Sequence, residues 1–181
     1  MFAKTLTDAE LLLLGLVAEM PRHGYELEQV IEQRGMREWT QIGFSSIYFV
    51  LGKLEKVGFI GAEKPSGIKA RKAYAITPAG HAALVAQTLE ALSVPRPTYS
   101  SALLGMAHWP VLSREAALGA LDARGKTISE EMLRLERVRT ERQPLPDFVE
   151  ALFDHSVSLL AAEKTWVAKT LDYMQTKPWT E

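Results

Sequence analysis

Apolar residues recur at helical spacing through most of the chain, and the pattern is sharpest between Gly43 and Ile60. From about Ser45, one side of the expected helix is apolar and ends at a glycine, with Ile47, Leu51, Leu54 and Gly58 in register. The opposite side is small, hydroxylated, aromatic and basic, and it carries Ser45, Phe49, Gly52, Lys53 and Lys56. Because this side has no carboxylate, it suits a negatively charged groove. The alternative is the solvated face of a small helical bundle.

Two further helices are expected before this segment. Thr7 and Glu10 have the spacing of a capping box, which predicts a leucine-rich helix that ends at Pro21. We interpret it as a buried core helix, with burial against a second subunit as the alternative. A turn over residues 21–24 then leads into a second helix, and Gly35 has the position of its left-handed terminator.

A hairpin is expected directly after the third helix. Residues 59–64 and 70–76 favour two short strands joined by a turn with proline and glycine. The tip and the returning strand carry Lys69, Arg71 and Lys72 and no acid. Three helices followed by a basic two-stranded wing predict a winged helix-turn-helix domain in a mostly α-helical protein.

The second half of the chain predicts long amphipathic helices. A proline-containing linker at 93–98 separates a DNA-binding domain, residues 1–92, from a helical domain, residues 99–181. Within that helical domain, a short helix precedes two long ones that form an αα-hairpin. A lone hairpin leaves apolar surface uncovered, so we expect it to pair with a second subunit. The expected dimer contacts are Leu152, Leu159, Leu160, Trp166 and Leu171.

Four motifs in one order carry a family resemblance. They are Leu14-Gly15-Leu16, His23-Gly24-Tyr25-Glu26-Leu27, the series Ser46-Ile47-Tyr48, Leu51, Leu54-Glu55, Gly58-Phe59-Ile60, and the series Tyr74, Ile76-Thr77, Gly80. Over about residues 6–85 the chain resembles the N-terminal domain of the PadR family of transcriptional regulators, and the C-terminal region is similar in architecture to the dimerisation domain of its longer members. The resemblance implies a homodimeric repressor whose third helix enters the major groove. The chain departs from the family pattern at two places on the DNA side. Phe49 stands where members often carry proline, and the run 70–73 stands where members often carry arginine and proline.

Composition narrows the alternatives. The chain has 181 residues, is 47% hydrophobic and contains no cysteine, which excludes disulfides and thiolate metal sites. No signal peptide or membrane span is apparent, so we expect a cytoplasmic protein without a membrane partner. The formal net charge of −1 does not favour nucleic acid, and any DNA-binding surface must therefore come from local clustering. A winged-helix scaffold that binds an acidic protein, without an operator, is the alternative function.

Catalytic and metal-binding patterns are not apparent. The four histidines form no i, i+4 pair, and neither a phosphate-binding glycine loop nor a nucleophile elbow is present. The acids lie at spacings typical of charge pairs on solvated helices. We therefore expect no enzyme activity, no catalytic residue, no metal and no cofactor.

Two sets of site residues follow. The expected contacts to double-stranded DNA are Tyr25, Ser45, Ser46, Tyr48, Phe49, Lys53, Lys69, Arg71 and Lys72. The aromatics near the dimer domain, Tyr99, Trp109, Phe153 and Trp166, are most simply core and interface residues. A site for a small aromatic effector is the alternative, because some PadR members respond to such molecules.

Overall fold

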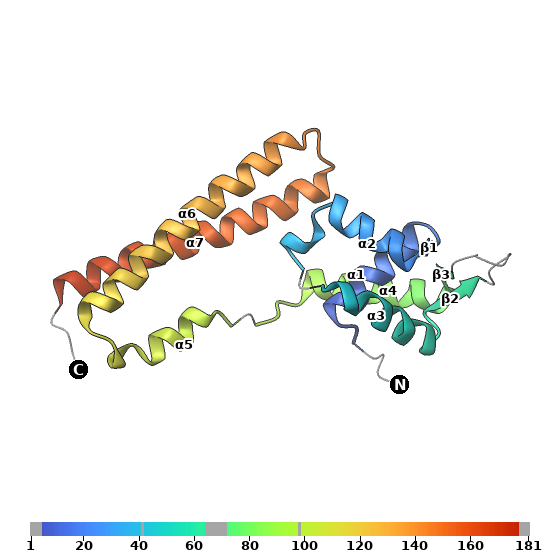
Figure 1. The fold of residues 1–181 in the computed structure, drawn as a ribbon, viewed down its shortest axis with the longest axis horizontal. Helices are drawn as coiled ribbons and strands as arrows, with labels where there is room; N and C mark the ends of the chain where they lie inside the picture. Colours follow the sequence, from blue (N-terminus) through green and yellow to red (C-terminus); the bar gives the residue numbers. More distant parts are fainter. Residues whose placement is uncertain (1–4, 41, 64–71, 98, 178–181) are drawn as a thin grey trace. The chain divides into compact units, whose positions relative to one another are not determined.

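The elements of the chain fall into two units, Met1–Pro97 and Thr98–Glu181 (Figure 1). The structure, a computed structural model, describes residues 5–40, 42–63, 72–97 and 99–177. The N-terminal unit contains, in order, α1 (Asp8–Glu19), β1 (Arg22–His23), α2 (Gly24–Gln33), a 3-10 turn (Met36–Glu38), α3 (Phe44–Lys56), β2 (Ile60–Glu63), β3 (Ala73–Ile76) and α4 (Pro78–Ser93). The C-terminal unit contains α5 (Ser101–Ala107), a 3-10 turn (Trp109–Val111), α6 (Arg114–Glu141) and α7 (Asp147–Thr176).

The capping box predicted for α1 is confirmed. The Thr7 hydroxyl accepts the Glu10 N–H at 3.3 Å, and the Glu10 carboxylate accepts the Thr7 N–H at 2.8 Å. The leucine-rich helix that follows buries Leu13, Leu14 and Val17, so its interpretation as a core helix holds.

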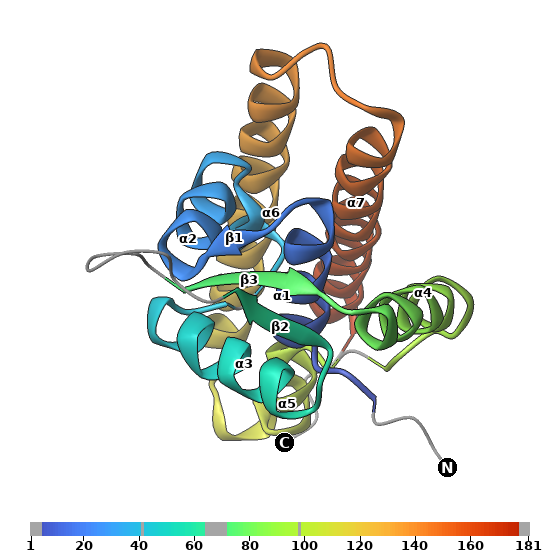
Figure 2. The ribbon, with the colours of Figure 1, turned by 90° about the vertical axis from the view of Figure 1, so that its right-hand side faces the viewer.

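The predicted two-stranded wing is confirmed as the antiparallel pair of β2 and β3, and within the described ranges a third short strand, β1, joins the same sheet. Residues 21–24, predicted as a turn, include β1, which pairs antiparallel with β3 through Arg22 opposite Tyr74. The strand order is β1-β3-β2, with β3 in the middle (Figure 2). The predicted strand 70–76 is described only from residue 72, and the turn over 64–71 lies outside the described residues.

The inner face of α3 completes the core of this unit. Ile47, Leu51 and Leu54 are fully buried, as their spacing predicts. Gly58, predicted on the same face, is instead exposed beyond the end of the helix. Its φ of 78° is a left-handed conformation, so it terminates α3 rather than packing inward.

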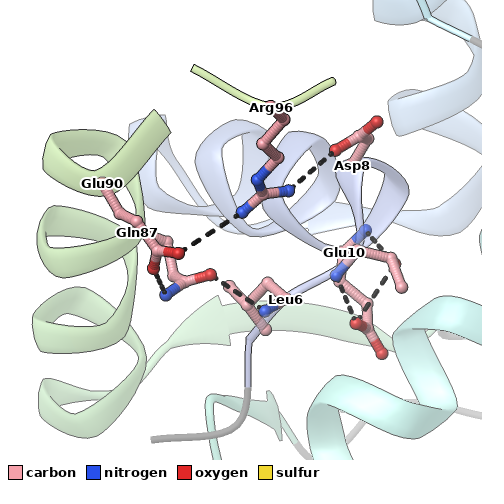
Figure 3. A network of polar contacts seen from close by, with 7 residues as sticks. Leu6, Asp8, Glu10, Gln87, Glu90 and Arg96 are labelled. Atoms are coloured by element: carbon pink, nitrogen blue, oxygen red, sulfur yellow. Dashed lines mark hydrogen bonds and ion pairs between the residues drawn. The ribbon is translucent and has the colours of Figure 1, made fainter. Parts of the chain in front are cut away.

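Polar contacts link the start of α1 to α4. The buried Gln87 side chain accepts the Leu6 N–H at 3.0 Å and donates to Glu90 at 2.8 Å. Arg96 lies between Asp8 and Glu90, 3.7 Å from each carboxylate (Figure 3). Residues that follow α4 thus belong to the same unit as α1.

In the C-terminal unit, α6 and α7 form the predicted helical hairpin (Figure 1). Gly125 of α6 faces α7, because a Cβ there would lie in van der Waals contact with a Val167 methyl at 3.4 Å. The Arg114 guanidinium donates to the carbonyls of Met174 and Gln175 at 2.7 and 2.9 Å, and so caps the last turn of α7. Across the described ranges, no helix is both long and apolar enough to span a bilayer.

Candidate nucleic-acid interface

The outer face of α3 presents two large aromatic side chains. Tyr48 is 59% exposed and Phe49 is 69% exposed, although both belong to a helix whose opposite side is fully buried. Gly52 adds an open position between them and the end of the helix, since a Cβ there would meet no atom within 4 Å. The face is therefore aromatic and sterically accessible.

Tyr48 joins this face to the start of α2. A Cβ at Gly24 would lie 2.5 Å from a ring carbon of Tyr48, so the ring packs directly on the Gly24 backbone. The next residue, Tyr25, is about half exposed at the first turn of α2. A glycine at position 24 thus leaves room for the Tyr48 ring at the residue that precedes Tyr25.

The first turn of α3 has the composition of an anion-binding helix start. It contains Ser45 and half-buried Ser46, it has no acidic residue, and Gly43 at the N-cap supplies no side-chain cap. The positive end of the helix dipole lies at this turn. The side chain of Ser45 itself is outside the described part of the structure.

Lys53 is not the unpaired cation that its position on the outer face suggested. Its ammonium lies 2.8 Å from the Glu10 carboxylate, and the Glu10 side chain is only 3% exposed. The same ammonium lies over the Phe49 ring, 5.6 Å from the centroid. Helical periodicity placed Lys53 correctly but could not show that a carboxylate from α1 reaches it.

On the wing, the structure describes one of the three predicted basic residues. The Lys72 ammonium is 2.7 Å from the Glu55 carboxylate and 5.1 Å from the centroid of the Tyr74 ring. The hydrogen bond to Glu55 raises the pKa of Lys72, which keeps it charged. Lys69 and Arg71 lie outside the described residues.

The predicted effector residues differ in exposure and lie outside the two grooves described between α6 and α7. Tyr99 is exposed, while Trp109, Phe153 and Trp166 are half-buried. Phe153 and Trp166 lie on one helix about 20 Å apart along its axis, at about 1.5 Å per residue. Two shallow grooves of about 590 and 440 Å³ run between α6 and α7, and none of these four residues lines them.

The predicted dimer contacts divide into two groups on α7. Leu152 and Leu159 are exposed, whereas Leu160, Trp166 and Leu171 are half-buried. The residues of α7 that are buried within the unit are Val167 and Met174. Among the five, Leu152 and Leu159 are therefore the most accessible to a second chain.

Sequence reasoning missed Glu10 as part of this face. It was interpreted only as a capping residue, which it is. The spacing of a capping box does not show that Glu10 is buried beside a lysine of another helix, so this contact could not be predicted from the sequence. Among the described residues, no three His, Cys, Asp or Glu side chains gather as metal ligands.

The three-helix core, the sheet and the exposed face of α3 define a winged helix-turn-helix protein. Residues 13–86 match the model of the Transcriptional regulator PadR-like family. The N-terminal unit therefore carries the PadR-like domain, and the resemblance predicted from the motifs is confirmed. No curated protein matches the chain.

Solved structures share this fold over nearly the whole chain. Bacillus subtilis PadR in complex with operator DNA matches with a TM-score of 0.74 and 20% identity, over 93% of this chain and 99% of that chain. The same protein in complex with p-coumaric acid matches with a TM-score of 0.74 and 19% identity, over 92% of this chain and 98% of that chain. A PadR-like transcriptional regulator from Bacillus cereus matches with a TM-score of 0.67 and 20% identity, over 94% of this chain and 100% of that chain. At these identities the likeness establishes the fold.

Proposed function

We propose that the protein is a homodimeric transcriptional repressor whose α3 enters the major groove of a palindromic operator. The observation that carries the proposal is the outer face of α3, where Tyr48 and Phe49 are exposed within a PadR-like domain. Exposed aromatic surface beside a buried core is typical of a binding site. A transcriptional regulator of this kind acts on DNA in the cytoplasm.

Each predicted contact has a distinct chemical role. Ser45 and Ser46 meet phosphate at the helix N-terminus, and Phe49 contacts a thymine methyl group. Tyr25 and Tyr48 flank Phe49 beside the groove. The wing cations Lys69, Arg71 and Lys72 neutralise phosphates of the adjacent backbone.

Dimerisation through the C-terminal unit is the reason that we expect a palindromic operator. Two recognition helices related by a dyad read half-sites about 34–36 Å apart, or a multiple of that distance. Exposed apolar residues on α5 and α7, among them Leu103, Leu104 and Leu159, support pairing with a second copy of this unit.

Release by a small aromatic molecule is part of the proposal. Support comes from the p-coumaric acid complex of Bacillus subtilis PadR. The residues predicted for such a site are Tyr99, Trp109, Phe153 and Trp166. Addition of p-coumaric acid should raise the melting temperature and release a fluorescent operator. If melting and release are both unchanged, this acid is not the effector.

Selection from a random pool of duplex DNA tests the main proposal. We expect an enriched palindrome and a retarded complex that survives non-specific competitor DNA. Salt-sensitive binding to any duplex, without enrichment, would contradict it.

Two predicted DNA contacts form ion pairs within the chain, which bears on the scaffold alternative. Lys53 and Lys72 both pair with carboxylates within the chain, which lowers the positive charge of the face. These pairs weaken attraction to DNA and to an acidic protein alike, so the scaffold alternative rests on the formal net charge of −1. Failure of the random-pool selection would support that scaffold.

A further inference from the structure

Two lysines of the N-terminal unit form ion pairs of different kinds. Lys53, whose side chain is 38% exposed, pairs with Glu10, whose side chain is 3% exposed. Lys72 pairs with Glu55, and both of these side chains are at least one-third exposed. Exposed pairs are weak and exchange partners readily, whereas withdrawal of Lys53 would leave the buried Glu10 carboxylate without its counter-charge. The two lysines therefore differ in their freedom to bind phosphate.

Glu10 is held in place from several directions. One carboxylate oxygen accepts the N–H and the hydroxyl of Thr7 at 2.8 and 3.1 Å, and the other lies 2.8 Å from the Lys53 ammonium. Burial raises the pKa of the Glu10 carboxyl, but hydrogen bonds from Lys53 and Thr7 outweigh it and hold that pKa below its usual value. Glu10 is therefore an ionised, hydrogen-bonded anchor for the Lys53 ammonium.

The anchored ammonium reaches the exposed ring of Phe49. Residues 49 and 53 lie one turn apart on α3, and the distance from the Lys53 Nζ to the ring centroid is 5.6 Å. This distance is within the range of a cation–π contact. A ring covered on one face by a fixed cation has fewer orientations than a free phenylalanine.

We propose that Glu10 is a positioning residue for Phe49. Its buried carboxylate anchors Lys53, and Lys53 fixes the Phe49 ring for contact with a base. Lys53 then acts as a support within the protein and not as a phosphate ligand. This inference rests on the proposed operator binding, and it replaces the predicted role of Lys53.

The experiment compares base preference with salt dependence in one set of variants. Operators are selected from a random pool by the wild type and by Phe49→Ala, Lys53→Met, Lys53→Arg and Lys72→Met. The double variant Glu10→Gln/Lys53→Met removes both charges and so avoids an unpaired carboxylate. Circular dichroism and urea unfolding check the fold of each variant, and affinity is measured between about 50 and 200 mM salt, a range of about fourfold.

We expect Phe49→Ala to abolish the preference at one base pair of the half-site. Lys53→Met and the double variant should weaken the same preference by about two- to fivefold, while their salt slope stays that of the wild type. Lys53→Arg should keep the preference, because arginine retains the charge. Lys72→Met should flatten the slope by about 0.9 for each phosphate that the ammonium no longer neutralises, and it should leave the preference intact.

Two results would overturn the inference. In the first, Lys53→Met flattens the salt slope as Lys72→Met does. In the second, Phe49→Ala and Lys53→Met do not alter the same base pair. If the wild type itself selects no operator, the proposed function fails, which is a different outcome.

Discussion

At the scale of single residues, two glycines fix how close the elements of the N-terminal unit come. A Cβ at Gly80 would lie 2.0 Å from the carbonyl oxygen of Phe59, which also accepts the Thr77 N–H at 3.0 Å. The start of α4 can therefore dock on the residue before β2 only without a side chain at position 80. Gly24 has the same role beneath the Tyr48 ring.

Gly80→Ala should destabilise the N-terminal unit by about 1–3 kcal/mol, because backbone atoms must move to admit the methyl group. Urea unfolding monitored by circular dichroism measures the change. Gly52→Ala is the matched control, since its methyl group meets open space in the middle of a helix, and it should stabilise the protein by about 0.5–1 kcal/mol. Equal stability of the two variants would show that the contact at Gly80 is relieved without cost.

At the scale of elements, Glu19 connects the end of α1 with β1 and the end of α2. Its carboxylate lies 2.6 Å from Arg34 and 2.7 Å from Arg22. A carboxylate at a helix C-terminus is unfavourable beside the dipole, and the two guanidinium groups compensate for it. The hydrogen bond from Arg34 lowers the pKa of the Glu19 carboxyl. Burial raises it by less, so the pKa stays below its usual value.

The lowered pKa predicts a pH-dependent contribution to stability. It is fully present above the unfolded-state pKa of about 4.3 and is lost as the pH falls through the lower folded-state value. Glu19→Gln should therefore cost up to about 1 kcal/mol at neutral pH, a small value because the pair is partly exposed. Urea titrations at neutral pH and near pH 3 should show this difference closing in acid. If the difference in unfolding free energy between the wild type and Glu19→Gln is the same at both pH values, it does not come from ionisation of Glu19.

At the scale of the whole molecule, exposed apolar side chains are abundant in the C-terminal unit. Residues of α5 to α7 with large exposed apolar side chains include Leu103, Leu104, Leu133, Phe148 and Leu159. The hairpin uses Ala117, Ile128 and Leu135 of α6 with Val167 and Met174 of α7 for its own packing. The remaining apolar surface is the basis for the proposed dimer.

Leu159→Asp should weaken the dimer, because burial of a carboxylate in an apolar interface is unfavourable. Light scattering coupled to size exclusion should show a shift from dimer to monomer, together with loss of binding to a two-half-site operator. Ser158→Asp adds the same charge at the adjacent exposed position on the polar side of α7, and it should leave the dimer intact. Dimers of equal strength in both variants would place the interface elsewhere.

Local chemistry in the sequence determined most of the elements. Capping residues such as Thr7, Thr77 and Ser113 mark helix starts because their hydrogen bonds reach only two or three residues along the chain. Helical periodicity placed Ile47, Leu51 and Leu54 inside and Phe49 outside for the same reason: the helix itself sets that geometry. Ordered motifs were enough to identify the PadR-like domain.

Features that arise from contacts between distant segments became apparent only in the tertiary structure. The pairing of β1 with β3 gives residues 22–23 a strand conformation that their own sequence does not favour. The Glu10–Lys53 pair joins α1 to α3, and so places a buried carboxylate beside a predicted DNA contact that also lies over Phe49. Such contacts form between residues far apart in the chain, where neither periodicity nor capping carries information. The charge of the outer face of α3 therefore depends on how α1 packs against it.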